Sequence, residues 1–205
     1  MQIMYWINRW ACLLCMIIAC VFSVSRVYAA SHIIDLNAPT AHVQLKMIDG
    51  RVFDLTPAVG ANRIFYDSQV HQVERDAYVA VFQVLDSNPA QPSGFCGAGN
   101  EVWLHIYQIV GQHLNEKNNV LVSSCLGSFS LASQSSGEPL QESDFSSVKW
   151  QTNGFSIEWF NKHNPAGLPL SATGYVVGDE VLRTTDVVSD DPKGRTPSTK
   201  SLEEE

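Results

Sequence analysis

The residue best suited to covalent chemistry is Cys96, which lies in the glycine-rich stretch Gly-Phe-Cys-Gly-Ala-Gly at residues 94–99. A catalytic cysteine needs a thiolate stabilised by a nearby imidazolium or helix N-terminus, and it cannot react while it is disulfide-bonded. Cysteine transpeptidases of the bacterial envelope carry His-Gly and Ser-x-Gly-Cys elements, which have no counterpart in this chain. Whether Cys96 is a nucleophile or half of a disulfide therefore depends on the compartment and on the other cysteines.

The first 29 residues predict a secretory signal peptide. They contain no acidic residue, an arginine precedes an apolar run over residues 10–24, and the segment ends in Val-Tyr-Ala at residues 27–29. These are the charged, apolar and cleavage regions of an export signal, and the run is shorter than the roughly 20 residues that span a bilayer. Ile-Ile-Ala-Cys at residues 17–20 also resembles a lipobox, in which Cys20 would carry a lipid and tether the protein to a membrane. Both routes predict a periplasmic location.

Only Cys96 and Cys125 remain beyond this segment, because the other three cysteines lie inside it. A single pair of cysteines in an oxidising compartment predicts a disulfide. In the chain-entropy treatment, a cross-link of this span stabilises the fold by about 3 kcal/mol or slightly more. The sequence therefore favours a Cys96–Cys125 disulfide over a nucleophilic Cys96.

The other residues that could do chemistry form no recognisable site. The six histidines fall at no metal-ligand spacing, and no phosphate loop or dinucleotide fingerprint is present, so neither a metal nor a cofactor is predicted. His105 stands out because Trp103 and Tyr107 flank it on one face of an expected strand. Two interpretations stay open for this face. It is either an aromatic binding surface on which His105 makes the polar contacts to a ligand, or a strand face half-covered by another element.

Strand patterns dominate the rest of the chain, and the best helical candidate is the short segment over residues 69–76, for which a loop is the alternative. An Asp-Gly pair at residues 49–50 predicts a hairpin with a three-residue loop, which places Val43 opposite Leu55 on the apolar face. Residues 78–85 place apolar side chains on both faces of an expected strand, which predicts a strand covered on both sides.

Residues 102–110 and 120–132 form two expected long strands, joined by a polar loop over residues 111–119. Symmetric pairing about that loop places Cys125 opposite Leu104. Cys96 could then reach Cys125 only if the glycine-rich loop folded back over the sheet, because the two Cα atoms must come within about 7 Å.

Asn-Gly at residues 153–154 is the strongest turn signal, because this dipeptide is preferred in type I′ turns. Centring a hairpin on it pairs Trp150 with Ile157, and it also pairs Lys149 with Glu158 on the solvent side.

A last hairpin is expected to pair residues 175–177 with residues 180–182. Residues 189–205 are too poor in apolar groups to pack, so a disordered acidic tail is predicted. Residues 30–188 are expected to form one all-β, mainly antiparallel domain with one disulfide and little helix. A sandwich and a barrel both fit this pattern.

The charge of the mature chain favours basic partners. Two of the 13 basic residues lie in the signal segment, so 11 remain against 21 acidic ones, a formal net charge of −10. Such a surface repels nucleic acid and anionic lipid. We expect an exported, non-enzymatic binding protein that captures or inhibits a basic envelope protein such as a cell-wall hydrolase, in the manner of small periplasmic lysozyme inhibitors and immunity proteins. The alternatives are an envelope hydrolase that uses scattered carboxylates and His105, or a glycan-binding surface module.

Recognition is expected on the loop over residues 90–100, because a loop pinned by a disulfide loses little conformational entropy on binding. Phe95 would be its apolar anchor and Glu101 a charged flank, unless Phe95 packs under the loop. A second expected surface is the strand face formed by Trp103, His105 and Tyr107.

Overall fold

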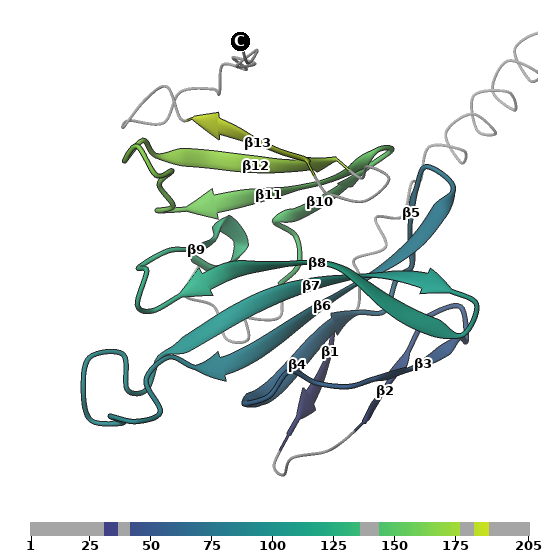
Figure 1. Cartoon of the computed structure of the whole chain (residues 1–205), viewed down its shortest axis with the longest axis horizontal. Coiled ribbons are helices and arrows are strands. Elements are labelled where there is room, and N and C mark those ends of the chain that lie inside the picture. The colour runs from purple at the N-terminus through teal and green to yellow at the C-terminus, as the bar shows by residue number, and fades with distance from the viewer. Residues whose placement is uncertain (1–30, 37–41, 136–143, 177–182, 189–205) are drawn as a thin grey trace, which may run out of the picture.

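The computed structural model describes residues 31–36, 42–135, 144–176 and 183–188. Their regular structure is all β apart from one short 3-10 turn, η1 (Ala132–Ser135), and every strand pairing is antiparallel. The sheets are stacked and do not close into a barrel (Figure 1). Within the described ranges, no helix is long and apolar enough to cross a membrane. The expected signal peptide, the lipobox cysteine Cys20 and the expected tail lie outside the described residues.

The described residues form three sheets. The largest has the strand order β1-β4-β6-β7-β8, with β5 beside β6. Its strands are β1 (Ser31–Asp35), β4 (Ala61–Asp67), β5 (His71–Val73), β6 (Asp76–Asp86), β7 (Asn100–Val110) and β8 (His113–Ser124). The second sheet contains β9 (Ser130–Leu131), β10 (Val148–Gln151), β11 (Gly154–Phe160), β12 (Leu170–Val176) and β13 (Arg183–Val188). The third is the hairpin of β2 (Val43–Lys46) and β3 (Val52–Leu55).

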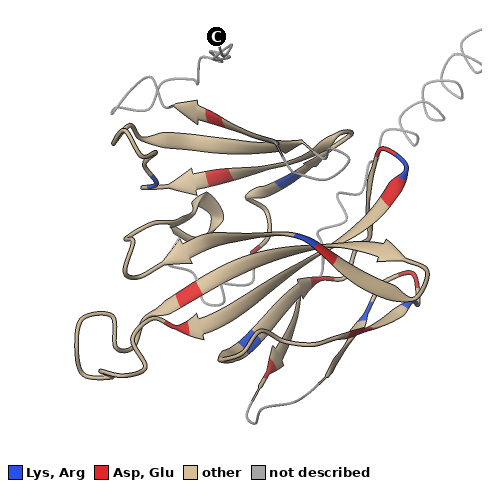
Figure 2. Cartoon of the chain, in the orientation of Figure 1, with Lys and Arg blue, Asp and Glu red and all other residues tan. Residues whose placement is uncertain are grey.

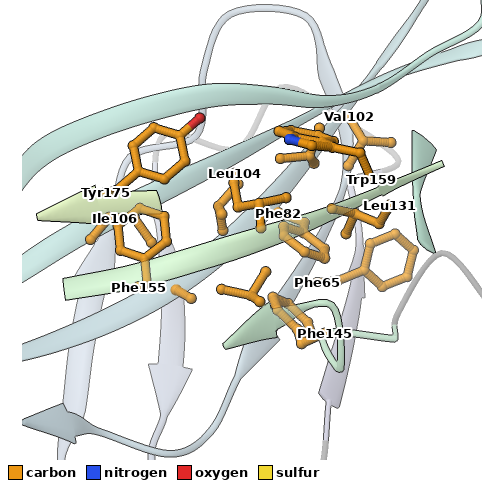
Figure 3. Packing of buried hydrophobic residues seen from close by; sticks show 14 of the residues in the cluster. Phe65, Phe82, Val102, Leu104, Ile106, Leu131, Phe145, Phe155, Trp159 and Tyr175 are labelled. Carbon is orange, nitrogen blue, oxygen red and sulfur yellow. The ribbon is translucent and has the colours of Figure 1, made fainter. Parts of the chain in front are cut away.

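Strand β6 lies inside the largest sheet and is covered on both faces, as the sequence predicted. On one face Phe82 stacks on Phe145 with ring centroids 3.9 Å apart, within a core that includes Leu104 of β7 and the inner face of the second sheet (Figure 3). On the other face Val79 and Val81 pack under the β2–β3 hairpin. Full burial of a valine, leucine or phenylalanine side chain stabilises a fold by about 1.5–3 kcal/mol. The largest sheet is therefore the middle layer of the molecule.

The register predicted for the β2–β3 hairpin is confirmed. Val43 lies opposite Leu55, and Leu45 lies opposite Phe53. Gly50 has a φ of 87°, a left-handed conformation that glycine adopts without steric cost.

The helix expected over residues 69–76 is wrong, because this segment is an extended hairpin arm made of β5 and the start of β6. Val73 is completely buried between exposed neighbours, which is a strand pattern. Its turn contains Glu74 with a φ of 55°. Neither Glu74 nor Arg75 is a usual turn former, so the sequence carried no signal for this hairpin.

The long polar loop expected over residues 111–119 is also wrong. Val110 pairs with His113, so the β7–β8 connection contains only two residues, and the polar stretch continues as β8 at the edge of the sheet. As a result Val120, and not Cys125, lies opposite Leu104. The expected second strand also ends early, at Ser124, before the chain crosses to β9 in the second sheet.

The hairpin expected at Asn153-Gly154 forms two residues away from the predicted register. Trp150 pairs with Phe155, not with Ile157, and Gly154 is already part of β11. The reason is the close approach of β12, because a Cβ on residue 154 would overlap the carbonyl oxygen of Tyr175. The predicted Lys149–Glu158 contact still forms across the diagonal, at 3.6 Å.

The last hairpin also differs from the prediction. Tyr175 of β12 pairs with Thr184 of β13, two residues beyond the expected partner. Its turn lies outside the described residues.

Candidate functional site

The predicted disulfide is present between Cys96 and Cys125, with 5.8 Å between the two Cα atoms. The glycine-rich loop does not fold back over the sheet to form it. Cys125 directly follows β8, and its amide donates a hydrogen bond to the carbonyl of Asn100 at 3.2 Å. The disulfide therefore closes the end of the largest sheet, and the loop over residues 87–99 projects beyond that end (Figure 1).

The projecting loop is held by successive turns as well as by the disulfide. Four amides each donate to the carbonyl three residues earlier, and they belong to Gln91, Gly94, Gly97 and Gly99. Ser87 closes the base by donating its amide to the carbonyl of Gly99 at 2.9 Å. A Cβ on Gly99 would lie 2.6 Å from the Cys125 sulfur, so this glycine makes room for the cross-link. These turns and the cross-link together restrict the conformation of the loop.

Phe95 is 74% exposed on this loop, so it does not pack underneath it. Its carbonyl accepts a hydrogen bond from the Asn88 side chain at 3.1 Å, which fixes the backbone beside the ring. Leu126 and Phe160 are 53% and 47% exposed, one next to Cys125 and the other across the adjoining pocket. These three exposed side chains, Phe95, Leu126 and Phe160, are together called the apolar tip below.

Two residues of the apolar tip, Phe95 and Leu126, lie in stretches of the chain without charge. Residues 87–100 and 118–135 contain no Asp, Glu, Lys or Arg, and Figure 2 shows the projecting loop without a charged residue. Contacts made here would rest on apolar burial and neutral hydrogen bonds.

Glu101, the expected charged flank, is tied into the fold. Its Oε1 accepts hydrogen bonds from the Ser87 hydroxyl at 2.7 Å and from the Leu126 amide at 3.3 Å. Glu101 therefore links the base of the projecting loop to the turn after Cys125, and it positions the apolar tip.

The face of Trp103, His105 and Tyr107 is largely covered. Tyr107 belongs to the core beneath the β2–β3 hairpin, and its hydroxyl accepts a hydrogen bond from the buried Gln83 amide at 3.3 Å. Only 8% of His105 and 6% of Tyr107 is exposed, and Trp103 is partly buried. Burial raises the pKa of the Tyr107 hydroxyl, so it stays neutral.

His105 lies in an apolar environment beside one carboxylate. Burial lowers its pKa, while Glu116, with Oε1 3.3 Å from Nδ1, opposes that shift. The two atoms are close enough for Coulomb attraction but not aligned as a hydrogen bond, so Nδ1 has no hydrogen-bond partner among the described residues. A histidine that is disfavoured as a cation and shielded from solvent is poorly placed as a general base.

A pocket of about 350 Å³ adjoins the apolar tip where the two larger sheets meet. It is lined by Asn100, Val102, Ser123, Ser124, Cys125, Ser128, Phe129, Ser130, Gln134, Phe160 and Asn161. None of these side chains is charged, and this hydroxyl- and amide-lined cavity is called the neutral pocket below.

Lys162 packs on Phe129, which lines the neutral pocket, and joins the two larger sheets. Its Nζ lies 3.6 Å from the centroid of the Trp159 ring and 4.7 Å from that of Phe129, and it donates to the carbonyl of Leu121 at 3.5 Å. Burial lowers the pKa of Lys162 to about 8, and Asp186 opposes this shift. The rings favour the ammonium form, so the side chain acts as a cationic link between β11 and the edge strand β8.

His71 and Asp67 form a close pair that the sequence did not predict. They lie at the other contact between the two larger sheets, where β5 meets β10. His71 Nε2 is 2.7 Å from Oδ2 of the buried Asp67, and the His71 ring stacks on Trp150 with centroids 4.3 Å apart. The Glu74 amide donates to the Thr152 carbonyl at 2.8 Å beside it. These contacts hold the β5 arm against β10. Within the described residues, no three His, Cys, Asp or Glu side chains lie close enough to hold a metal ion.

Sequence reasoning also missed the neutral pocket. Its residues come from the ends of β7, β8 and β11 and from the turn after Cys125, so no local spacing marks them. The only sequence signal is the absence of charge over residues 118–135. No known protein family, curated protein or solved structure matches this chain.

Proposed function

We propose that this chain is an exported, non-enzymatic binding protein that captures or inhibits a basic envelope protein, such as a cell-wall hydrolase, through the apolar tip. The observation that carries the proposal is the 74% exposure of Phe95 on a loop closed by the Cys96–Cys125 disulfide. An exposed aromatic side chain on a mobile loop would lose conformational freedom on binding. On a pinned loop it loses less, which favours recognition.

The apolar tip supplies the kind of contact that dominates protein interfaces. A few aromatic and aliphatic anchors in the centre of an interface carry most of the binding energy. Burying a side chain of the size of Phe95 contributes about 1.5–3 kcal/mol, which corresponds to roughly 10- to 150-fold in affinity.

Charge supports the choice of a basic partner. The expected mature chain has a net charge of −10, yet residues 87–100 and 118–135 carry none. The acidic remainder of the surface would attract a basic protein over distances of about a Debye length. The apolar tip would then dock without having to desolvate a charge.

The proposal is tested by affinity capture from envelope extract. The exported protein is immobilised as wild type, Phe95→Ala and Ile48→Ala, at salt concentrations of about 50 mM and 500 mM. Ile48 is a matched control because it is 67% exposed in the β2–β3 turn, away from the disulfide. All three proteins should have the same melting temperature.

We expect wild type and Ile48→Ala to retain a basic envelope protein at low salt and to lose most of it at high salt. Phe95→Ala should retain at least tenfold less, because the apolar anchor is missing. Equal retention by all three proteins, or retention of acidic proteins alone, would contradict the proposed function.

A further inference from the structure

The neutral pocket has a fixed wall and the dimensions of a ligand site. Its volume of about 350 Å³ is at the small end of the roughly 300–1,000 Å³ found for ligand pockets. Asn100 and Ser123 lie at one side, on the ends of β7 and β8, and Asn161 lies at the other, just after β11. Cys125 also lines the pocket, and its cross-link to Cys96 holds this part of the pocket wall in place.

Four polar side chains of the pocket are available to a ligand. Among the residues that the structure describes, the side chains of Asn100, Ser123, Ser128 and Asn161 have no hydrogen-bond partner. Neighbouring Ser124 differs, because its hydroxyl accepts a hydrogen bond from the Gly127 amide at 2.7 Å. Serine hydroxyls and asparagine amides each donate and accept, so these four groups can bind a ligand that does the same.

Two of these four residues hold a backbone conformation that glycine would adopt more easily. Ser128 has a φ of 55° and Asn161 a φ of 59°, both in the left-handed region. The disulfide cysteine Cys96, at the rim, has a φ of 57°. Side chains kept in left-handed conformations concentrate at functional sites. Glycine would adopt this backbone conformation without steric conflict, so the Ser128 side chain is held at the pocket at a conformational cost.

The composition of the pocket selects one class of ligand. No lining residue is charged, so the pocket offers no counter-charge to a phosphate, a carboxylate or an amine. Lys162, whose ammonium lies over the ring of the pocket residue Phe129, is already held by Trp159 and the Leu121 carbonyl. The Phe129 and Phe160 rings provide apolar surface among the hydroxyls and amides. Sugars combine hydroxyl groups with apolar C–H faces, which matches this mixture.

We propose that the neutral pocket binds a mono- or disaccharide unit of an uncharged glycan. Ser128 and Asn161 would hydrogen-bond the sugar hydroxyl or acetamido groups, and Phe160, which is 47% exposed, would cover an apolar face of the ring. This site shares Phe160 with the apolar tip, but its chemistry differs from the capture of a protein by Phe95, and neither proposal depends on the other.

The test is a titration of the exported protein with chitotetraose, maltotetraose and cellotetraose, followed by ¹H–¹⁵N NMR spectra. A heparin-derived tetrasaccharide serves as the anionic comparison. We expect saturable shifts of the amides over residues 123–130 and around Asn161 with at least one neutral sugar, and weaker binding of the anionic one. No protein partner is needed, so the outcome is independent of the proposed function.

Substitutions with glycine remove the two side chains without disturbing the backbone. Ser128→Gly and Asn161→Gly place glycine where φ is already positive, so the melting temperature should not fall. Each should weaken sugar binding about two- to tenfold, the effect of one lost hydrogen bond, and Phe160→Ala should do the same or more. Glu74→Gly is the matched control, because Glu74 has a φ of 55° and lines no part of this pocket.

Three results would overturn the assignment. The first is no saturable shift with any neutral sugar at about 10 mM, where even millimolar affinity would be visible. The second is tighter binding of the anionic tetrasaccharide than of every neutral one. The third is unchanged affinity in Ser128→Gly, Asn161→Gly and Phe160→Ala.

Discussion

Replacing both Cys96 and Cys125 by serine tests how much the cross-link contributes to the fold. The two residues are separated by 29 positions along the chain. In the chain-entropy treatment, opening a loop of that length adds about 12 cal/mol/K to the entropy of the unfolded chain, or about 3.6 kcal/mol at 25 °C. A small domain has a total stability of about 5–15 kcal/mol, so the variant should still fold but with a much smaller margin.

Urea unfolding of wild type and of the double variant at neutral pH measures this difference directly. We expect the free energy of unfolding to fall by about 2–5 kcal/mol and the urea dependence to rise, because the unfolded chain is no longer cross-linked. A loss below about 1 kcal/mol would refute the reasoning, since the turns at Gln91, Gly94, Gly97 and Gly99 would then hold the loop without the disulfide. Free-thiol labelling of the denatured, unreduced wild type should detect no thiol in the exported chain. Two thiols would contradict the disulfide.

Three further substitutions or measurements test the register, the buried histidine and export. Gly154→Ala should destabilise the protein by about 3 kcal/mol or more, because the added Cβ overlaps the Tyr175 carbonyl, whereas Asn153→Ala should cost less than about 1 kcal/mol; equal costs in urea unfolding would favour a turn centred on residues 153–154. The folded-state pKa of His105 is lowered below the unfolded value of about 6.5, so the unfolded chain binds the proton first and stability falls as the pH drops below about 6.5. His105→Gln should lose part of that dependence, and identical pH profiles between about pH 7.5 and 5 would contradict it. The intact mass of the exported protein should correspond to a chain that begins at Ala30, whereas a lipid-modified Cys20 would replace that prediction with membrane tethering.

Local patterns were sufficient where each element is defined by its own residues. Alternation of apolar residues together with Asp49-Gly50 specifies the register of the β2–β3 hairpin, because any one-residue slip would expose Leu45 and Phe53. The unbroken apolar run of β6 predicted a strand covered on both faces. Counting the cysteines outside the expected signal segment was enough to predict the disulfide.

Other elements depend on contacts that no local pattern encodes. Residues 113–119 are polar because β8 is an edge strand, and an exposed edge has the composition of a loop. The turn at Glu74 uses a left-handed non-glycine residue, which the packing of Val73 and the Glu74–Thr152 backbone hydrogen bond maintain. Gly154 resembles a turn glycine, but its role is to admit the backbone of β12.

The candidate site could be predicted only in part. The loop over residues 90–100 and Phe95 followed from the cysteine pair, but the sequence could not decide whether Phe95 packs or projects. The neutral pocket joins residues from Asn100 to Asn161, so it exists only once the two sheets are stacked.

The central claim, that Phe95 is the anchor of the recognition surface, is tested most directly by photo-crosslinking in living cells. A photoreactive phenylalanine analogue is placed at position 95 of the full chain, and at the exposed position 48 in a matched strain. We predict a covalent adduct with a basic envelope protein from position 95 and none from position 48. An adduct from position 48 alone, or no adduct from position 95 in cells that export the protein, would contradict the account.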